Sequence, residues 1–186
     1  RTRRATVAML LVGLAIFSSL YSTQAILPTL VRNMGLSSTA AAMTVSAATG
    51  ALALCVVPAS ILSERFGRGR ILLISAVAAT GVGLIVPLAQ EGWQLIVVRG
   101  LQGALLSGAP ATAMAWLSEE LDDKALPRAM GLYIAGTSVG GLTGRLIPTG
   151  LVEISTWRWA LFGSALVSLA FAITALVLVS PPAHFS

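Results

Sequence analysis

Charged residues are scarce in this sequence, and the scarcity limits the class of protein that it can encode. Asp, Glu, Lys and Arg together make up 10% of its 186 residues, whereas soluble globular domains contain about a quarter. Hydrophobic residues make up 56%, and the mean hydropathy is +0.87. These values exclude an ordinary soluble fold. They also exclude intrinsic disorder, which requires low hydrophobicity and high net charge.

Cysteine and histidine are nearly absent, with Cys55 and His184 as the single examples. One cysteine cannot form an intrachain disulfide, and one residue of each type cannot complete a zinc site. The string Gly136-Thr-Ser138-Val-Gly140 matches the hydrolase pattern G-x-S-x-G, but that pattern needs a preceding strand and a catalytic histidine. We therefore expect no enzyme activity, no metal ion and no cofactor.

Six long segments are apolar and almost free of charge. About 20 such residues in a helix cross the 30 Å hydrocarbon core of a bilayer, and in lipid the backbone polar groups of a helix are paired within it. The sequence therefore predicts an all-α membrane protein, with the lipid bilayer as its first partner. The six predicted transmembrane helices are residues 6–31, 40–62, 71–89, 94–117, 126–151 and 157–179. Residues 181–186 are expected to begin a linker or a tail.

Basic residues are concentrated in alternate connections between the predicted spans. They do not form one stripe with interleaved aromatic residues, so the net charge of +5 does not indicate a nucleic-acid partner. One set of connections holds Arg32 and Arg158. The other set holds Arg1, Arg3, Arg4, Arg65, Arg68, Arg70, Lys124 and Arg128. Because cytoplasmic loops carry the excess of Lys and Arg, both termini are predicted to be cytoplasmic.

The connection after the second predicted span carries an ordered motif. Residues 60–70 read SILSERFGRGR, which resembles the signature loop of the major facilitator superfamily, roughly G-x-L-[AS]-[DE]-R-x-G-R-[RK]. Ser60 replaces the usual glycine, and Gly69 replaces a common second basic residue. The resemblance implies an ion-pair latch at the cytoplasmic gate, built on Glu64 and Arg68. The residues expected to form this latch are Glu64, Arg65, Gly67, Arg68 and Arg70, with Glu119 or Glu120 as a further acidic partner.

Two arginines lie inside predicted spans, where an ionisable residue costs at least about 2.5 kcal/mol and usually faces a cavity or a partner. The string from Arg99 to Gly103 (RGLQG) contains R-x-x-Q-G and resembles the fourth-helix motif of antiporters in the same superfamily, in which the arginine is linked to proton coupling. The alternative for Arg99 is that its side chain extends to the nearby outer surface. If Arg99 and Arg145 both face inward, their charges favour an anionic ligand or require an acid from elsewhere, such as Glu153.

Small and polar residues complete the candidate site. Gly136, Gly140 and Gly144 repeat every four residues, with Gly141 beside them, and this spacing permits close helix packing. The stretch resembles the fifth-helix motif of drug:proton antiporters. In the first span, Tyr21 and Gln24 are candidate ligand contacts together with Arg99, Gln102 and Arg145; hydrogen bonding between helices is the alternative.

The three motif resemblances together imply the N-terminal six-helix half of a secondary transporter, similar to bacterial drug or sugar efflux facilitators. The implied activity is efflux of a small molecule, with proton coupling, in the bacterial inner membrane. Its substrate site would lie between this half and a C-terminal half. The alternative is a six-helix membrane module that associates with a second copy of itself, burying the glycine stripe there, and does not transport alone.

Overall fold

The structure is a computed structural model that describes residues 2–179, and every regular element in that range is a helix. Two of the elements, η1 and η2, are single 3-10 turns. In chain order the elements are α1 (Thr2–Leu20), η1 (Gln24–Ile26), α2 (Leu27–Met34), α3 (Ser38–Phe66), α4 (Arg68–Val82), η2 (Val86–Leu88), α5 (Gly92–Leu106), α6 (Gly108–Glu120), α7 (Leu126–Ile154) and α8 (Trp157–Val179). The expectations for Arg1, His184 and the tail at 181–186 lie outside the described residues.

Three of the predicted spans are divided rather than continuous; the third is divided near its end, where α4 stops at Val82 and η2 follows. The first ends as α1 at Leu20, passes through a turn and η1, and resumes as α2, which has Pro28 in its first turn. The fourth divides at Ser107 into α5 and α6. Pro110 lies three residues after the division of the fourth span and has no N–H to donate to the carbonyl group of Leu106 four residues earlier.

Four helical segments are long and apolar enough to cross a membrane: residues 2–34, 38–66, 68–88 and 157–179. The α5–α6 pair and α7 are not among them. The all-helical architecture is therefore found as expected, while a count of six crossings stays a prediction.

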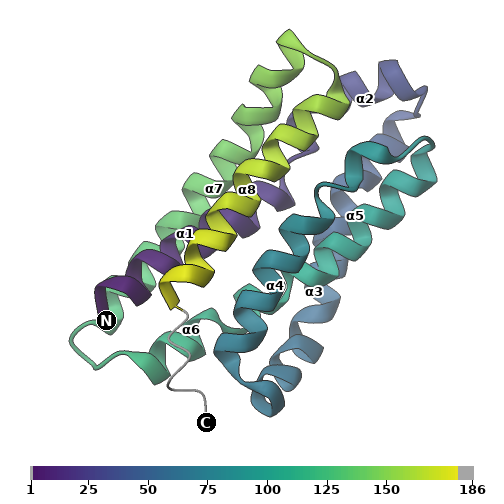
Figure 1. Ribbon diagram of the computed structural model, residues 1–186. Coiled ribbons are helices and arrows are strands. Elements are labelled where there is room, and N and C mark those ends of the chain that lie inside the picture. Colours follow the sequence, from purple (N-terminus) through teal and green to yellow (C-terminus); the bar gives the residue numbers. More distant parts are fainter. Residues whose placement is uncertain (1, 180–186) are drawn as a thin grey trace.

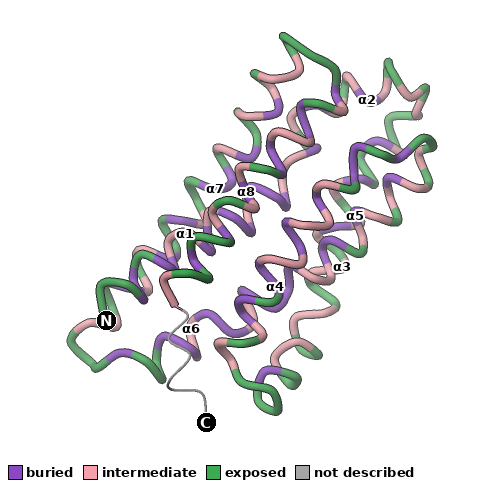
Figure 2. Tube along the Cα trace, in the orientation of Figure 1, coloured by how far each residue is buried: buried purple, intermediate pink, exposed green. Residues whose placement is uncertain are grey.

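The helices run along one another in two groups. Figure 1 shows α1, α7 and α8 side by side, and α3, α4 and α5 side by side, with the short α6 at one end. Contacts of α4 with α8 and of α1 with α4 and α6 join the two groups. Buried residues are frequent along α1 and α4, whereas α3 and α7 expose much of their length (Figure 2). The core between the groups includes Met9, Ile16, Leu72, Leu106 and Leu117.

The glycine stripe of α7 lies directly against the backbone of α1. A Cβ atom added at Gly136 would stand 2.5 Å from the carbonyl oxygen of Leu10, and one at Gly144 would stand 2.5 Å from that of Ser18. At Gly140 the distance to the carbonyl oxygen of Gly13 would be 2.9 Å. No side chain fits at these three positions, so the stripe is occupied within this chain and is not free to receive a second copy.

Candidate functional site

Arg99 projects from α5 into the interior and is 0% exposed. Its guanidinium group makes five hydrogen bonds and donates in all of them, two of them at 2.8 Å to the carbonyl groups of Ser19 and Thr44. The full set of acceptors is the carbonyl oxygens of Ser19, Leu20 and Thr44 and the side-chain oxygens of Ser22 and Gln102. Arg99 therefore points inward and does not extend to the surface.

The acceptors of Arg99 come from the place where α1 stops. The last carbonyl groups of an α-helix have no partner within the helix, and the end of α1 at Leu20 leaves such groups beside the guanidinium group. A helix C-terminus also carries partial negative charge, which favours a cation. No carboxylate among residues 2–179 pairs with Arg99 in the structure, and the carbonyl groups of α1 and α3 stabilise its charge instead.

Gln102 extends this polar network to α4. Its side-chain oxygen accepts a hydrogen bond from Arg99 at 2.7 Å, and its amide nitrogen donates to the carbonyl oxygen of Ala79 at 3.1 Å. A cavity of about 10 Å³ beside it is lined by Ser19, Ser22, Gln102, Ser164 and Ser168, with Gly83, Val86, Leu161 and Ala165. A space of this size holds about one water molecule. As found, Arg99 and Gln102 are thus closed to a larger ligand, and their contact with a substrate stays a prediction.

Arg145 lies in a different environment, on an exposed part of α7. Its Nε donates to the side-chain oxygen of Gln24 at 3.0 Å, and its guanidinium carbon lies 4.4 Å from the centre of the Tyr21 ring. A Cβ atom added at Gly141 would lie 3.7 Å from both the Arg145 and the Tyr21 side chain, which is ordinary van der Waals contact. The structure thus brings together Tyr21, Gln24 and Arg145, and it separates them from the buried pair of Arg99 and Gln102. Glu153, the nearby acid considered from the sequence, is not a partner of Arg145.

The signature loop is shorter than predicted. Helix α3 continues to Phe66 and α4 begins at Arg68, so Gly67 is the single connecting residue. Its φ of +101° lies in a region that glycine tolerates and other residues rarely adopt. Its N–H donates to the carbonyl oxygen of Ser63 at 2.9 Å, which closes the end of α3. The glycine of the motif is therefore required by the backbone.

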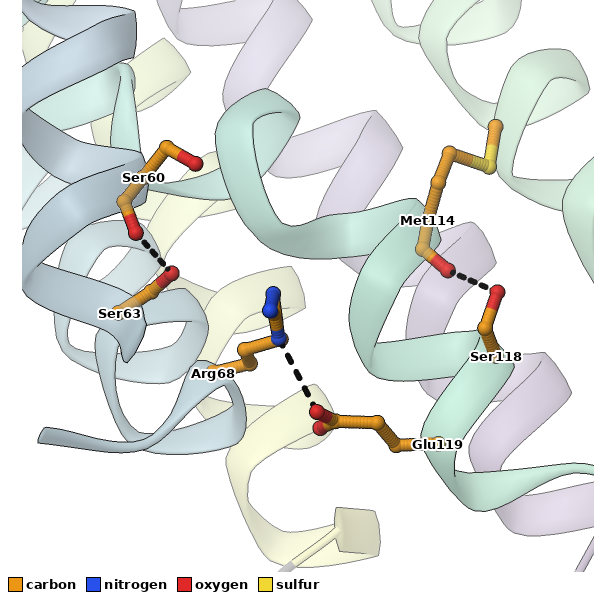
Figure 3. A network of polar contacts seen from close by, with 6 residues as sticks. All are labelled: Ser60, Ser63, Arg68, Met114, Ser118 and Glu119. Carbon is orange, nitrogen blue, oxygen red and sulfur yellow. Dashed lines mark hydrogen bonds and ion pairs between the residues drawn. The ribbon is translucent and has the colours of Figure 1, made fainter. Parts of the chain in front are cut away.

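Arg68 is paired with Glu119 at the end of α6. Its Nε lies 3.0 Å from the carboxylate, and Figure 3 shows the two side chains meeting between α4 and α6. The two side chains are 26% and 58% exposed. Glu64 and Arg65 lie on the exposed end of α3, and Arg65 stacks over the ring of Phe66. Among residues 2–179, Arg68 therefore pairs with Glu119, the further acidic partner, and not with Glu64, while a role of this pair in gating stays a prediction.

The glycine at position 69, where the motif commonly has a second basic residue, is explained by steric hindrance. A Cβ atom at this position would lie 2.7 Å from Nε1 of the Trp116 indole. The indole is rigid and 6% exposed, so it cannot move aside as a flexible side chain would. The packing of Trp116 against α4 therefore excludes the second basic residue that the motif usually has here.

Arg158 has a role that the sequence did not reveal. The sequence indicates only a charge in a connection between spans, whereas in the structure Nη1 of Arg158 donates to the carbonyl oxygens of Pro87 and Ala89, and the guanidinium carbon lies 4.4 Å from the centre of the Trp157 ring. Arg158 thus holds the end of η2 against α8. No local sequence pattern signals this contact, because donor and acceptors lie about 70 residues apart in the chain.

These features define an integral membrane protein built from apolar helices, with one buried arginine bound to the broken end of its first helix. The chain belongs to the major facilitator superfamily, because the family model described as Major Facilitator Superfamily matches residues 9–185.

Several relatives support this membership. The uncharacterized MFS-type transporter YybF of Bacillus subtilis is 33% identical over 99% of this chain and 46% of its own length. The inner membrane transport protein YnfM of Escherichia coli is 33% identical over 98% of this chain and 44% of its own length. A probable 4-methylmuconolactone transporter of Cupriavidus pinatubonensis is 30% identical over 60% of this chain and 27% of its own length. The chain therefore spans about half the length of the first two relatives.

Proposed function

We propose that this chain forms the N-terminal six-helix half of a secondary transporter that moves a small molecule across a bacterial inner membrane. All six predicted spans cross the bilayer in this proposal, and both termini are cytoplasmic. The names of the relatives support transport, since YnfM is named as an inner membrane transport protein. Efflux coupled to protons is the mode that the motif resemblance favours.

The observation that carries the proposal is the break in α1. Residues 21–26 leave the regular α-helix beside two arginines, Arg99 in the interior and Arg145 on the exposed side. Secondary transporters commonly bind substrates and coupling ions at discontinuous helices near the middle of the bilayer, where two structural repeats meet. A helix break with side chains and charges gathered around it is the kind of site that such a transporter needs.

The gate in this proposal is the contact between Arg68 and Glu119. It ties α4 to α6 at the end of the bundle where most basic residues of the connections lie. Alternating access requires contacts that hold one face closed and then release, and an ion pair at 26% and 58% exposure is weak enough to be exchanged.

The self-associating module is the competing proposal. Large apolar residues are exposed on α3 and α7, among them Leu54 at 80% and Leu146 at 58%. Either a second copy or a second half can cover such faces. We favour a second half, because the relatives are about twice as long as this chain and because α1 already covers the glycine stripe.

The test is a flux assay on the complete product of the reading frame that contains this sequence. The protein is reconstituted in liposomes under an imposed pH gradient, and release of a panel of labelled small molecules is measured. Saturable flux that collapses with the gradient supports the proposal. A native stop codon directly after residue 186, together with a dimer that gives no flux, would establish the self-associating module instead.

A further inference from the structure

Arg145 holds a positive charge far from either end of α7. The helix continues for nine residues to Ile154, which is about 13 Å along the axis at 1.5 Å per residue. Leu142, three residues before Arg145, and Leu146, the next residue, are exposed apolar residues. Among residues 2–179, the structure gives Arg145 no acidic partner. In the six-span arrangement proposed above, a charge at this position lies deep in the bilayer, where it is costly and indicates a functional site.

The guanidinium group of Arg145 is held in place by neutral groups. Gln24 accepts from its Nε, and the ring of Tyr21 packs against its face. These contacts hold the group at its Nε and over the Tyr21 ring, and its two terminal NH₂ groups have no acceptor among residues 2–179. A guanidinium group with both NH₂ groups available binds a carboxylate through two parallel hydrogen bonds.

The surrounding groups also favour an anion. An arginine can only donate, so the amide oxygen of Gln24 faces Arg145 and the amide NH₂ of Gln24 remains as a further donor. The phenol of Tyr21 can donate as well. The cluster therefore presents donors and one positive charge, which complements an anion and repels a cation.

Arg99 cannot perform this role as found, although it borders the same helix break. It is 0% exposed, and carbonyl and side-chain oxygens of the chain already accept from all three of its nitrogen atoms. Arg145 and Gln24 are exposed, and Tyr21 is half-buried. Of these two arginines, Arg145 is the one that an incoming ligand can reach.

We propose that the transported molecule is an organic anion whose carboxylate is bound by Arg145, with Gln24 and Tyr21 as positioning residues that can add hydrogen bonds of their own. This inference rests on the proposed transport function and adds the substrate class to it. No covalent step is involved.

The test measures binding and flux separately on the complete protein. Binding is followed by isothermal titration calorimetry with four probes: benzoate, succinate, the neutral amide benzamide and the cation benzyltrimethylammonium. We expect saturable binding of at least one carboxylate and none of benzamide or of the cation. Arg145→Gln is expected to weaken carboxylate binding at least tenfold, and Arg145→Lys to restore only part of it, because lysine keeps the charge but loses the planar fork.

The matched control is Arg128→Gln, which removes the same charge from the exposed first turn of the same helix and should leave binding unchanged. Equal binding by the Arg145→Gln variant overturns the inference, as does binding of the cation or the amide in preference to both carboxylates. Failure of the folded protein to bind either carboxylate also overturns it. Carboxylate binding that depends on Arg145 without any flux would support the carboxylate site at Arg145 and count against the proposed transport function.

Discussion

Arg99 and Arg145 are residues of the same type at the same break in α1, and their surroundings give them different chemistry. Arg99 is enclosed and bound to the carbonyl groups that end α1, so its charge is part of the fold. Arg145 is accessible and held at one edge and one face only. The sequence places both arginines at a similar depth in their predicted spans, so it does not distinguish them. Their hydrogen-bond partners in the structure distinguish them.

Replacing Arg99 by lysine should destabilise the protein although the charge is kept. An ammonium group has three donors and no planar fork, so it cannot serve the five acceptors around Arg99. Each buried acceptor left without a donor costs about 1–3 kcal/mol. We therefore expect a clear loss of thermal stability in detergent. Arg32→Lys, at an exposed position, is the control, and an unchanged melting temperature for Arg99→Lys would refute the structural role.

Two helix contacts set the shape of the bundle at the scale of elements. In the first, α1 and α7 meet through glycines, with no side chains between their backbones at three successive positions. In the second, α3 and α4 are joined by Gly67 alone, and Arg68, the first residue of α4, reaches across to α6. The contact between α1 and α7 is tightly packed backbone against backbone, whereas the contact between α4 and α6 is an ion pair that is partly exposed.

Adding a single methyl group to the glycine stripe should be costly. In Gly136→Ala the new Cβ atom would lie 2.5 Å from the carbonyl oxygen of Leu10, and overpacking of this kind typically costs about 1–3 kcal/mol. Gly131→Ala on the same helix is the matched control, because nothing lies within 4 Å of its Cβ position. Unfolding in detergent measures both variants. Equal stability of the two would show that α1 and α7 do not pack as described.

Exchanging the charges of Arg68 and Glu119 should separate gating from stability. An exposed ion pair contributes about 0–1 kcal/mol, so Arg68→Glu and Glu119→Arg should each insert and fold normally. We expect both single variants to lose flux and the double variant to recover it, since the double variant restores the ion pair. Flux in proteoliposomes is the measurement. Unchanged flux in the single variants would remove the gating role from this pair.

Membrane topology is the prediction that belongs to the whole molecule. Cysteines introduced at the exposed positions Arg65 and Asp123 should react with membrane-impermeant maleimide only after the cytoplasmic side is opened. Cysteines at the exposed positions Asn33 and Ser155 should react in intact cells. Cys55→Ser provides the background. Reaction of all four in intact cells, or of Asp123 on the same side as Ser155, would contradict six crossings.

The sequence predicted the helical architecture and the family, because long apolar segments and ordered motifs are local signals. The motif predicted a tight turn at Gly67, between α3 and α4, and Glu119 was a predicted candidate partner of Arg68. The sequence did not predict the end of α1 at Leu20, since residues 21–26 are as free of charge as the helix before them. Nor did it predict that Arg158 binds the end of η2 or that Trp116 excludes a side chain at Gly69. These contacts join residues far apart in the chain, and their geometry depends on packing.

The glycine contact between α1 and α7 also has a mechanical consequence. Side chains at an interface can change rotamer and so allow two helices to slide in small steps, but backbone pressed against backbone has no such freedom. Sliding would carry the next turn of α1 into the space left by Gly136, Gly140 and Gly144. We therefore expect α1 and α7 to move together as one rigid pair.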